Sequence, residues 1–209
     1  SNPVVGRTIE DKNGNLWIGT EGGGLNYYNR RTREFKWYRP QEGRNSISHN
    51  NVKALYYDAD KEIIWIGTHL GGLNKLDIRS GHFTHYRMEG NNPQSLPSDI
   101  IRDITPYKDL LIIATQNGVC LFNPANGQCR QLFKDSKEGK SIKMVADVVF
   151  DSEGTLWIAA TGEGVFSYRF DTRKLTNYRH DAANPNSLSN NNVNNITQDS
   201  KGNLWFSTS

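Results

Sequence analysis

Long apolar runs and a strong net charge are missing from this chain of 209 residues, and cysteine is scarce. No run approaches the ~20 apolar residues that a membrane-spanning helix needs, and residues 1–20 lack the apolar stretch of a signal peptide. A leader can be removed from a mature chain, so this absence does not indicate a cytosolic protein. The formal net charge of +3 gives no overall attraction to nucleic acid, and we expect no direct nucleic-acid binding.

Sequence motifs of catalysis and metal binding are absent as well. The chain has no Gly-x-Ser-x-Gly elbow, no His-Glu-x-x-His pair and no glycine-rich phosphate loop. His82 and His85 are three residues apart, but on a strand this spacing turns the two imidazoles to opposite faces. We therefore expect no catalytic residue, no metal site and no cofactor in this segment.

Glycine and aromatic residues are plentiful instead, with 19 Gly, 5 Trp, 9 Tyr and 8 Phe, which favours short strands joined by tight turns. One strand recurs five times. It reads Leu-Trp-Ile-Gly-Thr at 16–20, and its second position is occupied in turn by Trp17, Trp65, Ile112, Trp157 and Trp205. Successive copies lie 48, 47, 45 and 48 residues apart, and this near-constant spacing indicates a repeat fold.

Each period divides into four short strands, which is the make-up of a β-propeller blade. An apolar strand comes first, then a tight turn, the repeated strand, a glycine-rich bend, a third strand, a polar hairpin and a fourth strand. No stretch predicts an amphipathic helix of a dozen residues. We therefore predict an all-β fold, one β-propeller segment over 1–209 with blades of four antiparallel strands at about 4–51, 52–100, 101–146 and 147–192 and a partial blade at 193–209.

An incomplete propeller of about four and a half blades leaves two apolar faces without a neighbouring blade. We therefore expect the chain to associate with itself in solution.

An aspartate precedes the tight turn in several periods, as at Asp11, Asp151 and Asp199. Such a carboxylate accepts hydrogen bonds from the N–H groups of its own turn. A calcium loop is the alternative, but the segment after Asp11 lacks a closing glutamate at the required distance. We interpret these aspartates as structural.

Cys120 and Cys129 flank the hairpin tip of the third period. A two-residue loop at Pro124–Ala125 would place the two thiols opposite each other, as a possible disulfide in an oxidising compartment. Two buried small hydrophobic residues are an equally good interpretation.

The repeat resembles the two-component regulator propeller repeat. The resemblance rests on Asp-x-x-Gly-x-Leu-Trp-Ile-Gly-Thr at 11–20, Gly-Leu-Asn at 24–26, Phe35 and Tyr38, and Asn-Ser-Ile-Ser at 45–48. It extends over essentially the whole chain and is weakest in the third period, where Ile112 replaces Trp. It implies a periplasmic sensor region of a hybrid two-component system of Bacteroidetes, in an inner-membrane-anchored protein whose histidine kinase lies elsewhere and whose ligand is a glycan-derived oligosaccharide.

Ligand-binding residues are expected where two sets of loops meet at one end of a propeller. Carboxylates, carboxamides and imidazoles there suit sugar hydroxyls, which both donate and accept hydrogen bonds. Ordinary loop residues are the alternative interpretation, and a propeller glycan lyase or hydrolase and a protein-interaction scaffold are the alternative functions. The candidates for binding an oligosaccharide or other small ligand are Glu21, His69, Gln116 and Glu163 after the repeated strand, and Asn51, Asp99 and Asn191 between blades.

Overall fold

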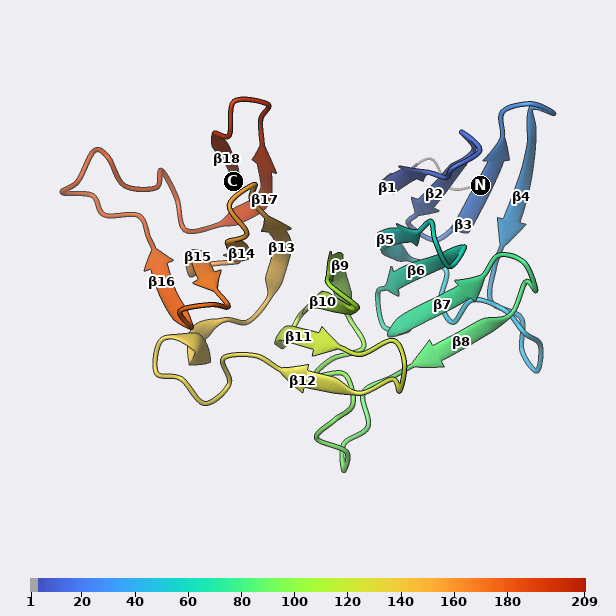
Figure 1. Cartoon of the computed structure of the whole chain (residues 1–209), viewed down its shortest axis with the longest axis horizontal. Coiled ribbons are helices and arrows are strands. Elements are labelled where there is room, and N and C mark those ends of the chain that lie inside the picture. Colours follow the sequence, from blue (N-terminus) through green and yellow to red (C-terminus); the bar gives the residue numbers. More distant parts are fainter. Residues whose placement is uncertain (1–3) are drawn as a thin grey trace.

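The computed structural model describes residues 4–209, which form five antiparallel sheets. Four sheets have four strands and the last has two, each in simple up-and-down order. Figure 1 shows the sheets following one another around an arc, with the N-terminal and C-terminal sheets on opposite sides of its opening. The all-β propeller-type fold is confirmed.

The first strand of each sheet faces the centre of the arc, and consecutive first strands contact one another. The strands are β1 (Val5–Glu10), β2 (Leu16–Thr20), β3 (Gly24–Asn29) and β4 (Glu34–Tyr38); β5 (Val52–Asp58), β6 (Ile63–Thr68), β7 (Leu73–Asp77) and β8 (Phe83–Tyr86); β9 (Ile101–Tyr107), β10 (Leu110–Thr115), β11 (Gly118–Phe122) and β12 (Cys129–Gln131); β13 (Val145–Phe150), β14 (Leu156–Ala160), β15 (Gly164–Arg169) and β16 (Lys174–Tyr178); and β17 (Val193–Gln198) and β18 (Leu204–Thr208).

Helix is almost absent from residues 4–209, where a three-residue 3-10 turn at Gly139–Ser141 is the single helical element. Within that range no helix is long and apolar enough to cross a membrane.

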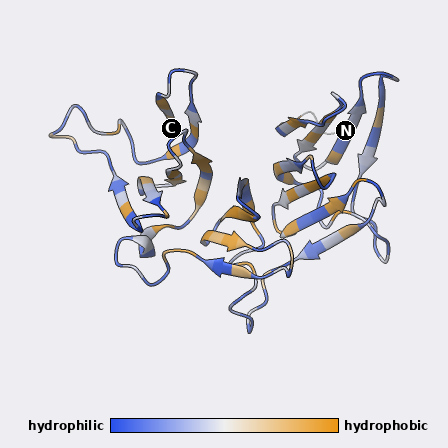
Figure 2. Ribbon diagram, viewed as in Figure 1, coloured by the Kyte–Doolittle hydropathy of each residue, from blue (hydrophilic) through white to orange (hydrophobic). Residues whose placement is uncertain are grey.

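The sheets are held together by the apolar side chains of the repeated strand. Trp17 and Trp65 are 2% and 1% exposed because each is covered by the following sheet, and the ring of Trp65 lies 5.5 Å from that of Phe122. Figure 2 shows the apolar residues concentrated on the strands and the polar ones on the loops. The hydrophobic effect thus acts mainly between blades, at about 25 cal/mol for each Å² of apolar surface removed from water.

Glycine is required by this packing at position 67 of the repeated strand. A Cβ at Gly67 would lie 2.5 Å from Cγ2 of Ile101 in the next sheet and 2.9 Å from Cβ of Ala54. A side chain at this position would therefore push neighbouring blades apart. Alanine replaces this glycine at Ala114 and Ala159.

Every first strand carries a β-bulge near its start. One residue is extra in the pairing with the second strand, so two consecutive residues face one partner. The extra residues are Gly6, Lys53, Arg102, Ala146 and Asn194, and the residues that follow them are Arg7, Ala54, Asp103, Asp147 and Asn195.

The expected register of the cysteine hairpin is wrong. Phe122, not Cys120, pairs with Cys129, because the tip is longer than two residues. The N–H of Gly127 donates to the carbonyl of Asn123 at 2.8 Å, and Gly127 takes a φ of 74° that closes the longer turn. The two cysteines are buried diagonal neighbours with Cα atoms 5.8 Å apart, and they are joined as a disulfide.

Candidate functional site

The repeated aspartates bind their own turns, as the sequence analysis proposes. Asp151 accepts hydrogen bonds from the N–H groups of Glu153 and Thr155 at 3.0 and 2.8 Å. It also accepts one from the indole N–H of Trp157 at 2.7 Å, a contact that the sequence analysis missed. The turn and the core tryptophan of the blade are thus tied to a single carboxylate.

Asp199 has the same role in the last blade. Hydrogen bonds from the indole of Trp205 and the amide of Asn203 lower the pKa of Asp199 to about 2. The carboxylate is therefore ionised at any physiological pH and can accept these hydrogen bonds throughout that range.

The two sets of candidate loops meet at one end of the arc. Gly24 N–H donates to the carbonyl of Asn50 at 2.7 Å, and Gly164 N–H donates to that of Asn191 at 3.0 Å. The loop after each repeated strand is therefore held against the loop that enters a first strand. Main-chain bonds fix the positions of the side chains there.

Four of the seven candidate residues have partners outside the group formed by the other three. Asp99 accepts a hydrogen bond from Met88 N–H at 2.7 Å, and Asn191 accepts one from His180 N–H at 2.7 Å. These two side chains close equivalent loops in different blades and are engaged by the main chain. Glu163 is paired with Arg179, and Gln116 is exposed with its carbonyl bonded to Met144 N–H.

Glu21, Asn51 and His69 are brought together where the first and second blades meet. Glu21 forms an ion pair with Lys53, which lowers the pKa of Glu21 through a hydrogen bond and through its charge. His69 N–H donates to the carbonyl of Asn51 at 2.9 Å. Nδ1 of His69 and the side-chain oxygen of Asn51 are buried and have no hydrogen-bond partner. The cluster therefore has unused capacity for hydrogen bonds.

Positive charge collects around this cluster. Burial lowers the pKa of His69, and the charges of Arg102, Lys53 and His49 lower it further. His69 is therefore neutral near pH 7, where its ring has one donor and one acceptor nitrogen. Lys53 and Arg102 were not predicted from the sequence, although both are the extra residues of their bulges. The other blades have Gly6, Ala146 and Asn194 at this position.

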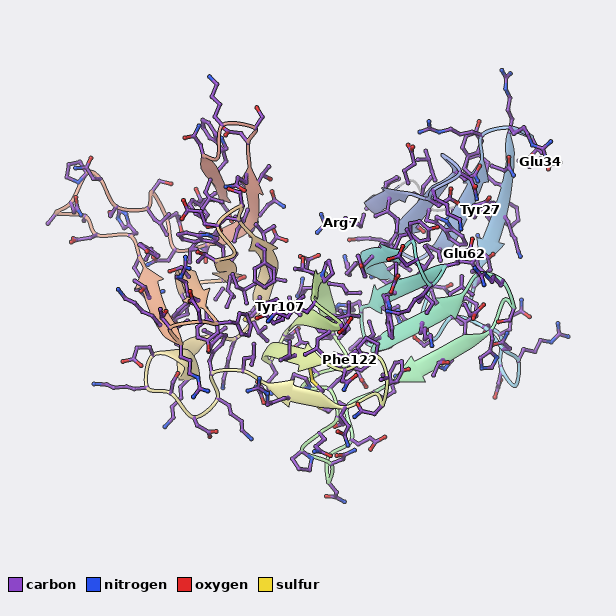
Figure 3. All side chains as sticks on the ribbon, viewed as in Figure 1. Arg7, Tyr27, Glu34, Glu62, Tyr107 and Phe122 are labelled. Carbon is purple, nitrogen blue, oxygen red and sulfur yellow. A yellow bond between two sulfur atoms is a disulfide. The ribbon has the colours of Figure 1, made fainter. Side chains whose placement is uncertain are left out.

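A second polar group lies at the centre of the arc. Arg7 projects from the first blade into the space between the sheets (Figure 3). Its Nη2 lies 2.9 Å from Oδ1 of Asp103 and 3.7 Å from Oδ1 of Asp147, both of them buried. These groups line a cavity of about 340 Å³ together with Asn195.

Each central carboxylate also binds the main chain of the next blade. Asp103 accepts from Val148 N–H at 3.3 Å, and Asp147 accepts from Ile196 N–H at 2.7 Å. Burial and the neighbouring charge of Asp103 raise the pKa of Asp147 to about 7. At neutral pH a large fraction of molecules therefore holds a proton on Asp147.

Comparison with known families supports the resemblance of the repeat. The family described as "Two component regulator propeller" matches residues 1–22, 46–69 and 187–209. These segments, about a third of the chain, are similar to two component regulator propeller repeats. They contain Glu21, Asn51, Lys53 and His69 of the cluster, so the junction of the first two blades is built from two matched repeats.

Solved structures share the propeller fold with this chain. The extracellular domain assigned to a one component system of B. thetaiotaomicron is 22% identical with a TM-score of 0.79, over 98% of this chain and 26% of that one. One assigned to a hybrid two component system of the same organism is 21% identical with a TM-score of 0.62, over 100% and 39%. The β-propeller domain of Cps50 (Swd1) from Myceliophteria thermophila is 12% identical with a TM-score of 0.67, over 100% and 63%.

The chain spans between about a quarter and two fifths of the two bacterial domains. The comparison with curated proteins gives no match.

Another cavity, of about 560 Å³, lies between β16 and β18 and is lined by Trp157, Tyr178 and Phe206. Comparison with the first blade accounts for this cavity without a ligand, because a side chain of the next sheet fills the equivalent space there. Beside Tyr38, which is equivalent to Tyr178, the corresponding space holds Phe83 of β8, with the two rings 5.9 Å apart. In residues 4–209, no set of three or more His, Cys, Asp or Glu side chains is arranged to hold a metal ion.

Proposed function

We propose that this chain is the ligand-binding part of an extracytoplasmic sensor region in a hybrid two-component system. The observation that carries the proposal is the match of three segments to the two component regulator propeller repeat. In this proposal the full-length protein is anchored in the inner membrane, the chain lies in the periplasm, and a histidine kinase elsewhere in the protein responds to binding.

The proposed ligand is a glycan-derived oligosaccharide bound over the cluster of Glu21, Asn51 and His69. The carboxylate, the carboxamide and the neutral imidazole supply both donors and acceptors, which sugar hydroxyls require. All three side chains are partly exposed and come from adjoining loops, which supports this location. Loops that a rigid scaffold holds in place are a common setting for recognition.

Self-association belongs to the same proposal. Trp205 is 63% exposed, whereas the equivalent Trp17 and Trp65 are 2% and 1% exposed beneath a neighbouring blade. An exposed aromatic surface of this kind favours contact with a second copy of the chain.

Isothermal titration calorimetry with a panel of glycan-derived oligosaccharides tests the binding proposal. We expect one class of oligosaccharide to bind saturably and to be recovered unchanged after incubation. Substitution Asn51→Ala should weaken binding about tenfold, the effect of losing about 1.4 kcal/mol. The matched control Asn126→Ala changes a carboxamide at the distant tip of the cysteine hairpin and should leave binding unchanged. Failure of the whole panel to bind would contradict the proposal.

A second candidate function is supported by the Asp103–Asp147 pair. A buried carboxyl group with a pKa of about 7 in a cavity has the property of a general acid, as a glycan lyase or hydrolase requires. The main-chain N–H groups of Val148 and Ile196 already engage both carboxylates, which favours a structural role. Chromatography of the incubated oligosaccharides decides between the two, because cleavage that disappears in Asp147→Asn would establish the enzyme.

A further inference from the structure

The first two junctions between blades are equivalent in structure but not in charge. Glu21 and His69 occupy the same repeat position, directly after Thr20 and Thr68 of the repeated strands. Lys53 and Arg102 likewise occupy one position, as the extra residues of the next first strands. At the first junction Glu21 neutralises Lys53. At the second junction an imidazole stands where the carboxylate would be.

Arg102 is consequently left without a counter-ion. Three arginines among residues 4–209 are partly buried, and two of them bind a carboxylate, Arg7 to Asp103 and Arg169 to Asp171. The guanidinium of Arg102 has neither an ion pair nor a hydrogen bond within the described range. A partly buried guanidinium with five unused donors is costly unless an anion or water satisfies it.

The surroundings of Arg102 are also suited to an anionic ligand. Lys53, the other cationic side chain that acts on His69, is already paired with Glu21, so the positive charge of Arg102 is the one that is not neutralised. Nδ1 of His69, which is buried and has no hydrogen-bond partner, lies at the same junction. A guanidinium binds a carboxylate through two parallel hydrogen bonds, which fixes the orientation of the ligand as well as its charge.

We propose that Arg102 binds the carboxylate of an acidic saccharide, a uronic acid unit, which takes the place at the second junction that the Glu21 carboxylate has at the first. This inference rests on the proposed function and narrows its ligand class. The ligand thus supplies at the second junction the carboxylate that Glu21 supplies at the first.

The substitution His69→Glu tests the inference by giving the second junction the carboxylate that the first junction has. A glutamate at 69 should pair with Arg102 as Glu21 pairs with Lys53, and so should occupy the site. The substitution Arg102→Gln should remove the site while keeping a polar side chain of similar length. The control Arg31→Gln removes an arginine from the exposed hairpin tip between β3 and β4.

The probes are glucuronate and a trimer of galacturonate, with glucose and a neutral galactose trimer as matched controls. Binding is measured by calorimetry and by NMR of the His69 ring and the Arg102 side-chain N–H groups. We expect saturable shifts with both acidic probes and at least about tenfold weaker binding in His69→Glu and Arg102→Gln, equivalent to about 1.4 kcal/mol. Arg31→Gln should bind as the parent chain does.

The outcomes separate the two proposals. Binding of a neutral saccharide that is insensitive to Arg102→Gln would overturn the carboxylate site but leave the sensor proposal standing. Equal binding of acidic and neutral probes would also overturn it, and so would binding of sulfated saccharides alone. No binding of any saccharide would overturn both.

Discussion

Substitution of Asp147 by asparagine should stabilise the chain at neutral and alkaline pH. Asp147 is 3% exposed and lies beside Asp103, so its ionised form suffers from burial and from a like charge. Asparagine keeps an oxygen that can accept the 2.7 Å hydrogen bond from Ile196 N–H, and its NH₂ group can replace the proton that faces Asp103. The variant thus imitates the protonated form at every pH.

The magnitude follows from the pKa of Asp147, which rises from 3.8 to about 7 on folding. Between these values the folded chain holds a proton that the unfolded chain has released, so the free energy of unfolding falls as the pH rises through the window. At 1.36 kcal/mol for each pKa unit the whole window corresponds to about 4 kcal/mol. Because the ion contact with Arg7 is weakened in the variant, we expect a gain of about 2–3 kcal/mol at about pH 8 and almost none at about pH 4.

Urea unfolding of both chains across that pH range measures the effect, with the slope of each transition checked for two-state behaviour. Asp60→Asn is the matched control, because Asp60 is exposed in the loop between β5 and β6 and should change stability little at any pH. A gain that is the same at all pH values, or a variant less stable than the parent at about pH 8, would refute the reasoning.

The substitution Asp151→Ala leaves the indole N–H of Trp157 and two turn N–H groups without their acceptor. We therefore expect the free energy of unfolding, measured by urea titration, to fall by about 2–3 kcal/mol. Gly67→Ala places a methyl group 2.5 Å from Cγ2 of Ile101, and thermal unfolding should show a loss of about 1–3 kcal/mol from overpacking. Trp205→Arg should shift sedimentation velocity profiles toward the monomer, because the most exposed tryptophan of the chain becomes charged.

These three effects have separate controls. Gly90→Ala adds a methyl group where nothing lies within 4 Å, so a comparable loss there would show that the Gly67 result is not caused by blade contact. An Asp151→Ala chain as stable as the parent would mean that water replaces the carboxylate at no cost. A parent chain that is monomeric at all concentrations would contradict the self-association proposal directly.

The architecture could be predicted because each blade repeats the same short sequence motifs. The turn aspartate, the Trp of the second strand and the glycine-rich bend are all local, and each is read from a few adjacent residues. The cysteine hairpin was mispredicted because its register depends on Gly127, whose left-handed φ of 74° closes a longer turn than the proline suggested. A single glycine decided which residue faces Cys129.

The candidate site could be predicted only in part. Glu21, Asn51 and His69 come from loops whose positions the repeat defines, but Arg7 and Asp103 are 96 residues apart and meet only because the blades curve around a centre. The curvature is set by blade packing as a whole, and no local pattern encodes it. Arg102 could have been found by aligning the repeats position by position, since it differs in charge from Gly6 and Ala146.

The bulge in each first strand has a consequence for how such a protein changes over generations. Its extra residue has no cross-strand partner of its own, so mutation there carries little penalty for the core. Gly6, Lys53, Arg102, Ala146 and Asn194 already show the range of side chains that this one position tolerates. Duplication of blades followed by drift at the bulges would therefore alter what the propeller recognises while leaving the inherited framework intact.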